Sequence, residues 1–326
     1  MSTLFIILFS IIGLIWGANH LITSATGIAQ YYRVPPLIIG LTIVAIASSA
    51  PEIIVGLASA LKDQNPIALG NALGSNIANI GLILGIILLI RPLTLQSSLL
   101  KREYPVIFIV MLFTYSLMLD GYLGVMDGCL FLMALILTIG YLIYLAKQSA
   151  KDVFAKEFNM IYKSKRSMVL NITGILFGGV LLAISAHFLV EYAAIIALRF
   201  GMSELTTGLT VIAIGTSLPQ LATSLIATFK KQDDIAVGNI LGSNIFNLLI
   251  VLIFPAIINP QAISRVVLWR DLPVMFAVTA ILLWINYQKK TKISRWHGGL
   301  LLLIYGCYVT AILLNAGLGD ILPDAA

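Results

Sequence analysis

The chain has 326 residues, of which 60% are hydrophobic and only 10% are charged. Soluble globular domains carry about 25% charged residues, so this composition excludes a soluble protein and indicates a polytopic membrane protein. The formal net charge of +6 does not imply a nucleic-acid partner, because lysines and arginines of a membrane protein gather in its cytoplasmic loops. Cys129 and Cys307 lie in apolar runs, and we expect small core residues there and not a disulfide.

Ten apolar segments are long enough to cross a membrane as helices, which takes about 20 residues. They cover approximately residues 2–30, 34–60, 66–90, 104–119, 123–146, 168–198, 204–229, 235–258, 271–287 and 297–316. Five precede the polar, basic stretch 147–167 and five follow it. The sequence therefore predicts an all-α membrane protein of two five-helix units, residues 1–146 and 168–326, joined by a basic loop.

The basic residues are distributed unequally between the two sides that ten crossings define. One side, which includes the 147–167 loop, receives 16 of the 20 lysines and arginines. Because basic loops remain in the cytoplasm, this side is predicted to be cytoplasmic and both termini external. Loops 62–66 and 230–234 then fall on opposite sides, so the two units are predicted to be inverted repeats, as in many secondary transporters.

Residues 40–79 and 208–247 are copies of each other. At a constant offset of 168 positions they align without a gap, and 20 of the 40 positions are identical. The identical residues include polar ones, among them Ser49 with Ser217 and Asn79 with Asn247. Polar residues that occur twice in apolar surroundings indicate a duplicated binding site.

The duplicated segments place oxygen atoms around an interrupted helix. A proline inside a helix leaves the carbonyl four residues earlier without its donor, so Pro51 frees that of Ala47 and Pro219 frees that of Gly215. Glu52 and Gln220 follow these prolines directly. Glu52 is the only acidic residue near the middle of a predicted span, and such a carboxylate is a functional candidate. Hydroxyl, amide, carbonyl and carboxylate oxygens suit sodium or calcium better than a transition metal.

Other polar residues have more than one interpretation. Asn71, Asn76, Asn239 and Asn244 either bind ions or only pack helices together. His20 and His187 are expected to be satisfied core or interface histidines. Glu191, about two turns from the outer end of its helix, either pairs with Arg199 or lines an access path.

The motifs AIASSAPE with GNALGSNIAN, and AIGTSLPQ with GNILGSNIFN, resemble the two alpha-repeats of the calcium/cation antiporter superfamily, in particular the bacterial inner-membrane sodium/calcium exchangers. The resemblance covers nearly the whole chain, and it implies clustered calcium and sodium sites at the membrane centre. It also implies that the first and sixth helices slide across the other eight to expose these sites alternately.

Carried over residue by residue, the resemblance assigns the ligands. A calcium-type site would use Glu52, the position of Gln220, and the backbone carbonyls of Ser48 and Thr216. The sodium-type sites would add the side chains of Ser49, Ser75, Asn79, Ser217, Ser243 and Asn247, and the carbonyls of Ala45 or Ala47 and of Ala213. No cofactor is implied besides the transported ions.

The chain departs from the superfamily pattern at two positions. Gln220 replaces a second glutamate, and Asn247 stands where that repeat can carry an aspartate. Glutamine keeps an oxygen ligand but removes the charge, so calcium affinity should fall. The first hypothesis is calcium export in exchange for sodium; the alternative is exchange of sodium, potassium or protons without calcium. A cation channel ranks lower, and an intramembrane enzyme lowest, because no metal-ligand or serine–base arrangement is apparent.

Overall fold

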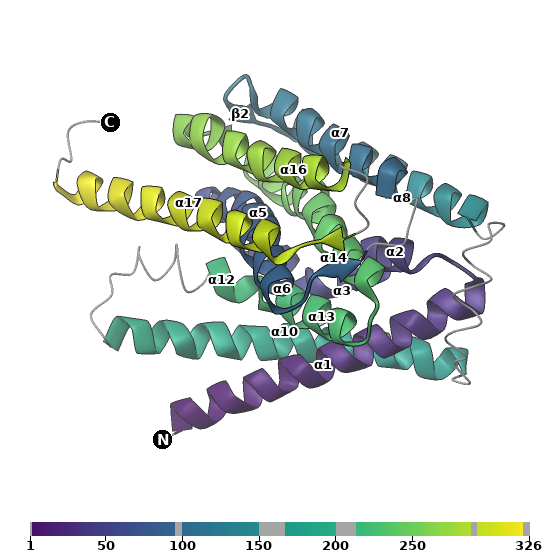
Figure 1. Ribbon diagram of the computed structural model, residues 1–326. Helices are drawn as coiled ribbons and strands as arrows, with labels where there is room; N and C mark the ends of the chain where they lie inside the picture. Colours follow the sequence, from purple (N-terminus) through teal and green to yellow (C-terminus); the bar gives the residue numbers. More distant parts are fainter. Residues whose placement is uncertain (1, 95–99, 150–166, 200–212, 288–291, 322–326) are drawn as a thin grey trace.

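The computed structural model describes residues 2–94, 100–149, 167–199, 213–287 and 292–321, nearly all of them helical (Figure 1). The helices of the first half, with π-helices named η, are α1 Ser2–Tyr32, α2 Pro36–Ile39, η1 Gly40–Val44, α3 Ala45–Ser48, α4 Ala50–Leu61, α5 Asn65–Ala78, η2 Asn79–Leu84, α6 Gly85–Ile90, α7 Leu100–Met118 and α8 Val125–Ser149. Those of the second half are α10 Met168–Arg199, α12 Ala213–Thr216, α13 Leu218–Phe229, α14 Asp233–Phe246, η4 Asn247–Val251, α15 Ile253–Ile258, η5 Val267–Asp271, α16 Leu272–Tyr287 and α17 Arg295–Ile321.

Within the described residues, seven helices are long and apolar enough to cross a membrane. An eighth crossing results if Pro36–Ser48 and Ala50–Leu61, which meet at a bend of 48°, count as one span. Two further apolar helices, Pro105–Met118 and Leu218–Phe229, are shorter. Each lies in a segment expected to cross, although residues 204–212 fall outside the described part of the chain. The all-helical membrane architecture is thus confirmed, while ten crossings stay a prediction.

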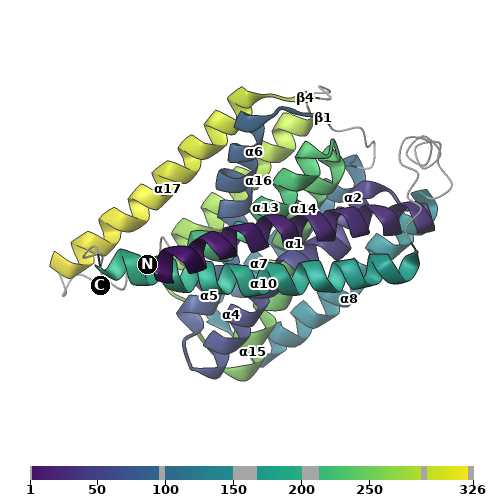
Figure 2. The same cartoon turned by 90° about the horizontal axis from the view of Figure 1, so that it is seen from below.

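The two longest helices, α1 and α10, lie side by side along one face of the molecule (Figures 1 and 2). They run antiparallel, since Gly17 meets Gly178 whereas Gly27 meets Asn171. A Cβ at Gly17 would lie 3.0 Å from the carbonyl oxygen of Gly178, so small residues allow the two backbones to approach closely. His20 lies at this interface, edge to face with Trp16 and Phe177 at centroid distances of 5.3 and 5.4 Å, as expected.

The interrupted helices occupy the middle of the molecule. Helices α7, α8, α16 and α17 cover them on the side away from α1 and α10 (Figure 1). The spans Pro66–Ile90 and Asp233–Ile258 are the most enclosed of the seven, whereas Arg295–Leu314 has little buried surface within the described structure. Polar groups on the central helices are therefore shielded from lipid on both sides.

Two short antiparallel strand pairs join the halves of the chain. β1 Leu93–Thr94 pairs with β4 Lys292–Ile293, and β2 Tyr122–Leu123 pairs with β3 Gln261–Ala262. Each strand has two residues, too few for an alternating pattern to be recognised in the sequence. These pairs are an addition to the predicted fold and leave it helical.

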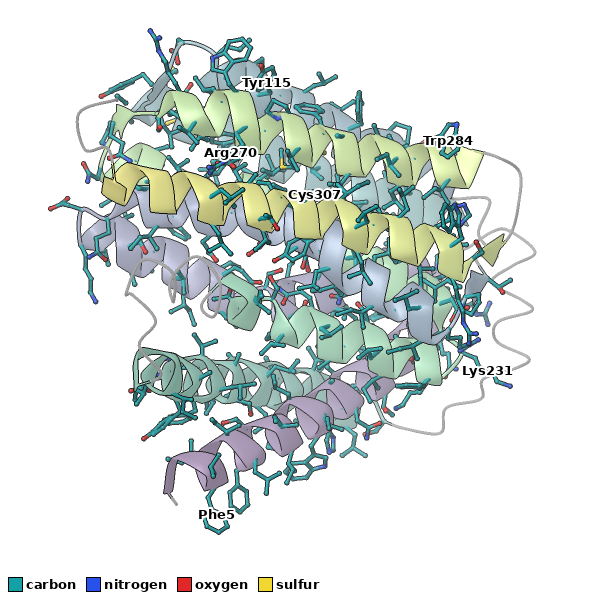
Figure 3. All side chains as sticks on the ribbon, turned by 60° about the vertical axis from the view of Figure 1, so that its left-hand side comes forward. Phe5, Tyr115, Lys231, Arg270, Trp284 and Cys307 are labelled. Carbon is teal, nitrogen blue, oxygen red and sulfur yellow. The ribbon has the colours of Figure 1, made fainter. Side chains whose placement is uncertain are left out.

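The expectation for the cysteines was half right. Cys129 on α8 and Cys307 on α17 are free, but both are exposed and not in the core. A helix that faces lipid is as apolar outside as inside, so an apolar run does not distinguish the two faces. Figure 3 shows Cys307 on the outer helix α17.

Candidate ion-binding site

The two prolines lie where the central helices are interrupted. Ser49 separates α3 from α4 with φ −83° and ψ 6°, and Ser217 separates α12 from α13 with φ −86° and ψ 2°. Pro51 and Pro219 occupy the first turns of the helices that follow, where proline is well tolerated because its missing N–H is not needed. The two interruptions are thus equivalent, 168 positions apart, with matching backbone angles.

Glu52 and Gln220 meet at the centre of these helices. Gln220 Nε2 donates a hydrogen bond to Glu52 Oε1 at 2.5 Å, and neither side chain is exposed. The other oxygens of the pair, Glu52 Oε2 and Gln220 Oε1, are buried without a hydrogen-bond partner among the described residues. The structure thus brings Glu52 and Gln220 together, and each keeps one oxygen without a hydrogen-bond partner among the described residues.

More oxygens of the predicted sodium-type set are buried without a hydrogen-bond partner among the described residues. They are Ser49 Oγ, Ser75 Oγ, Asn79 Oδ1, Ser217 Oγ and Asn247 Oδ1. Leaving a buried polar group unpaired costs about 1–3 kcal/mol, so a group of them on neighbouring helices has an explanation if it receives a ligand or water. The remaining predicted side chain, Ser243, contacts Ser48 at 3.5 Å between the Oγ atoms.

The residues predicted to contribute backbone carbonyls precede the two interruptions of the central helices. Ser48 donates its hydroxyl to Asn239 Oδ1 at 2.8 Å, and Thr216 donates to Asn71 Oδ1 at 3.5 Å. Ala45 is buried, whereas Ala47 is half-buried and faces Gly179 of α10. Ala213 is the first residue of α12, and its side chain falls outside the described residues.

Asn76 and Asn244 connect α5 to α14 directly. Asn76 Nδ2 donates to the carbonyl oxygen of Asn244 at 3.1 Å, and Asn244 Nδ2 donates to that of Asn76 at 3.2 Å. Asn79 Nδ2 adds a hydrogen bond to Asn244 Oδ1 at 2.9 Å. These contacts show that Asn76 and Asn244 pair the two helices, while Asn76 Oδ1 is buried without a hydrogen-bond partner among the described residues, so ion binding stays open for it.

A third polar network surrounds Asn239. Its Nδ2 donates to Thr223 Oγ1 at 2.8 Å and to Ser224 Oγ at 2.9 Å, and also approaches the carbonyl oxygen of Gln220 at 3.4 Å. Thr223 could not be predicted from the repeat, because the first repeat has Val55 and Gly56 where the second has Thr223 and Ser224. The available signal was this difference: a hydroxyl group in the second repeat at a position where the first repeat has none.

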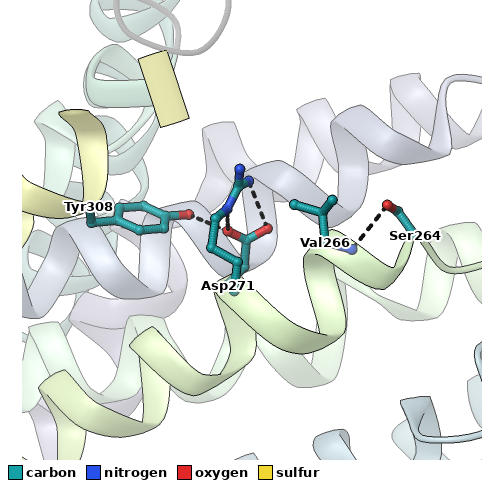
Figure 4. A network of polar contacts seen from close by, with 5 residues as sticks. Ser264, Val266, Asp271 and Tyr308 are labelled. Carbon is teal, nitrogen blue, oxygen red and sulfur yellow. Dashed lines mark hydrogen bonds and ion pairs between the residues drawn. The ribbon is translucent and has the colours of Figure 1, made fainter. Parts of the chain in front are cut away.

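A charged network lies where η5 meets α16 (Figure 4). Arg270 Nε donates to Asp271 Oδ1 at 2.8 Å, and the Tyr308 hydroxyl donates to the same oxygen at 3.0 Å. The sequence analysis assigned Arg270 to a loop and did not single out this group. A signal was present, since Arg270, Asp271 and Pro273 repeat the spacing of Arg102, Glu103 and Pro105.

The central donor set consists of hydroxyl and amide oxygens with one carboxylate, that of Glu52. In the described part of the chain, no group of three or more histidine, cysteine, aspartate or glutamate side chains could hold a metal ion. Oxygen donors with little charge are suited to hard cations that bind and leave, and unsuited to a tightly held transition metal. The site is therefore chemically fitted to an alkali or alkaline-earth cation as cargo.

Comparison with known proteins is consistent with this chemistry. The family described as "Sodium/calcium exchanger protein" matches residues 2–148 and 170–314. The chain is 40% identical over 307 residues to CaxA of Alkalimonas amylolytica, named as a candidate antiporter, covering 93% of this chain and 96% of that protein. It is 39% identical over 292 residues to the inner membrane protein YrbG of Escherichia coli, covering 88% and 89%.

A solved structure has the same fold. The sodium-calcium exchanger NCX_Mj, soaked with sodium and calcium, superimposes with a TM-score of 0.80 at 28% sequence identity, covering 95% of this chain and 98% of that one.

Proposed function

The chain belongs to the sodium/calcium exchanger family, and we propose that it exports calcium in exchange for sodium by alternating access around Glu52 and Gln220. The resemblance found in the paired motifs is thereby confirmed at the level of the family, which consists of membrane antiporters and not of enzymes. The direction of transport, the sodium coupling and the ligands are the proposal.

The observation that carries the proposal is the buried group of unpaired oxygens. Glu52 Oε2, Gln220 Oε1 and the other oxygens that are unpaired among the described residues belong to the interrupted central helices: Ser49, Ser75, Asn79, Ser217 and Asn247. An unpaired carboxylate oxygen in a membrane interior is costly, and a cation offsets that cost. The proposed ligands are the side chains of Glu52, Gln220, Ser49, Ser75, Asn79, Ser217, Ser243 and Asn247, and the carbonyls of Ser48, Thr216, Ala45 or Ala47, and Ala213.

The proposed topology is ten crossings in two inverted units, residues 1–146 and 168–326. Supporting it, α1 and α10 are equivalent elements that pack antiparallel. Contacts also recur at the offset of 168: Asn71 Nδ2 donates to the carbonyl of Glu52, as Asn239 Nδ2 does to that of Gln220. We place the chain in the bacterial inner membrane, as the name of YrbG suggests, with the 147–167 loop cytoplasmic and both termini external.

Antiport requires that the empty carrier change conformation poorly and that a bound ion permit the change. Here the carboxylate of Glu52 provides the charge that an ion must neutralise before the site can be occluded from water. Helices α1 and α10 form the layer that moves across the central helices, and their stripe of glycines allows one helix pair to slide as a unit.

A second candidate function is exchange of monovalent cations without calcium. The observation in its favour is that Gln220 takes the position of a second carboxylate and donates an N–H to the first. One carboxylate balances one sodium ion, but beside calcium it leaves a positive charge in a low-dielectric site. Potassium and proton are the alternative exchange partners for sodium.

Calcium-45 uptake into proteoliposomes separates the two functions. Purified protein is reconstituted, loaded with sodium or with an equal concentration of potassium, and diluted into calcium at fixed pH. Uptake that requires internal sodium establishes sodium/calcium exchange. Absence of calcium uptake with intact sodium-22 exchange establishes the monovalent function, and flux that needs no counter-ion would show a channel and contradict both.

A further inference from the structure

The turn between α13 and α14 is held against α1. Lys230 Nζ donates to Thr23 Oγ1, and Thr26 Oγ1 donates to Gln232 Oε1 at 2.9 Å. Thr26 and Gln232 are both buried, each 7% exposed. This end of α1 is therefore held to the turn by two polar contacts, of which the one between Thr26 and Gln232 is buried.

The equivalent turn in the first repeat, between α4 and α5, has the same backbone. Asp63 and Lys231, 168 positions apart, both have left-handed φ angles, of 57° and 60°. In each turn the residue after the left-handed one donates its backbone N–H to a carbonyl oxygen of the preceding helix at 2.8 Å: Gln64 to Ser59, and Gln232 to Ala227. The two turns are thus copies in geometry as well as in sequence.

The surroundings of the two turns differ. Lys62 and Gln64, the copies of Lys230 and Gln232, are exposed. Within the described residues, no side-chain hydrogen bond or ion pair joins either of them to α10, the helix equivalent to α1. One end of the molecule therefore has its long helix fixed to the turn, while at the other end the corresponding contact is open.

The residue of α10 that corresponds to Thr23 is Glu191. Its carboxylate is half-exposed and lies 3.6 Å from His187 on the same helix; the side chain of Arg199, the alternative partner, falls outside the described residues. At the end where α1 is held to the turn, the lysine of the turn, Lys230, meets the hydroxyl of Thr23. At the other end the corresponding residues are a lysine, Lys62, and a carboxylate, Glu191. Lys62 and Glu191 thus carry opposite charges at the positions that correspond to Lys230 and Thr23. Such a pair can form an ion pair when the α4–α5 turn approaches α10.

We propose that Lys62 and Glu191 form an ion pair in the opposite conformation of the carrier, when the contact of Lys230 with Thr23 opens. The proposal rests on alternating access and on the repeat relationship proposed above, because two equivalent halves in unequal conformations exchange those conformations when the carrier switches. An exposed ion pair is weak, so it can close one end of the α10–α4 contact and still open in each cycle.

Cysteine cross-linking tests the proposal without depending on which ion is transported. In a background with Cys129→Ser and Cys307→Ser, one protein carries Lys62→Cys with Glu191→Cys, and a matched control carries Thr23→Cys with Lys230→Cys. A short bifunctional thiol reagent is applied in saturating sodium, in calcium and without either ion. We expect the two cross-linking yields to change in opposite directions. Conditions that lower the yield of the control pair should raise the yield of the 62–191 pair.

Yields that rise and fall together, or a 62–191 pair that never reacts while the control does, would overturn the proposal. A charge exchange gives a second measure: Lys62→Glu and Glu191→Lys should each slow counter-ion exchange several-fold, and the double variant should recover most of the rate. Additive losses in the double variant would also overturn it. If the parent protein moves no cation but its cross-linking is still reciprocal, the proposed function fails and the ion pair stands.

Discussion

Asn76 and Asn244 donate hydrogen bonds to each other's backbone carbonyl oxygens, at 3.1 and 3.2 Å. The two residues are 168 positions apart, so this reciprocal contact places equivalent residues around a common centre. Because the bonds tie α5 to α14 in both directions, we expect these helices to remain together during transport while α1 and α10 move. The ligands on α5 and α14 would then form the fixed part of the site.

Replacement of Glu52 by Gln removes the only carboxylate of the central group. The side chain keeps its volume and an oxygen, so the protein should fold and remain soluble in detergent. Without the charge of Glu52, the conformational change no longer requires a bound cation. Loss of a charged partner in a buried site costs about 3–5 kcal/mol. We therefore expect exchange of calcium and of sodium to fall at least about a hundredfold. Isotope exchange in proteoliposomes measures it, and activity near that of the parent protein would refute the site assignment.

Replacement of Gln220 by Glu should have the opposite effect on calcium. The variant loses the N–H that occupies Glu52 Oε1 and places a second carboxylate beside it. A charge about 4 Å from the ion contributes about 4 kcal/mol at an effective dielectric constant of about 20, partly offset by desolvation. We expect the calcium Kd to fall about tenfold or more, measured by calorimetry. Gln220→Met is the control that removes the hydrogen bond without adding charge, and an equal change in both variants would contradict the argument.

Asn239 lies in a buried network with Ser48, Thr223 and Ser224, and its Nδ2 also approaches the carbonyl oxygen of Gln220 at 3.4 Å. Its replacement by Leu removes three hydrogen bonds from this network, each contributing about 0.5–1.5 kcal/mol, while each hydroxyl keeps a backbone acceptor. We expect a marked drop in the thermal unfolding temperature together with weaker ion binding. Asn71→Leu is the matched control, because Asn71 is only half-buried and makes two longer contacts, at 3.1 and 3.5 Å. An equal loss of stability in the two variants would show that the hydrogen bonds around Asn239 do not contribute specially to the stability of the protein.

The sequence predicted the centre of this protein better than its margins. Glu52 and Gln220, which the structure brings together, could be singled out because they follow prolines at a fixed offset and because proline has a definite effect on a helix; the serines and asparagines were candidates because they occur twice. Thr223 was missed because its copy in the first repeat, Val55, has no hydroxyl. The group of Arg270, Asp271 and Tyr308 was missed because Arg270 was taken as a loop residue and Tyr308 comes from another helix. The exposure of Cys129 and Cys307 was missed because lipid, unlike water, does not select polar surface residues.

Gly242 is the point at which α14 packs most closely on the first repeat. A Cβ at this position would overlap the carbonyl oxygen of Leu41 and lie 2.6 Å from Ala45 Cβ, so backbone atoms would have to shift. We expect Gly242→Ala to destabilise the protein by about 1–3 kcal/mol, as overpacking of a core does, and to displace Ala45 from its place beside the candidate site. Gly306→Ala on α17 is the control, since no described atom lies within 4 Å of a Cβ there. Thermal unfolding in detergent with and without saturating sodium measures both effects, and a Gly242→Ala protein as stable and as strongly stabilised by sodium as Gly306→Ala would show that this contact does not shape the site.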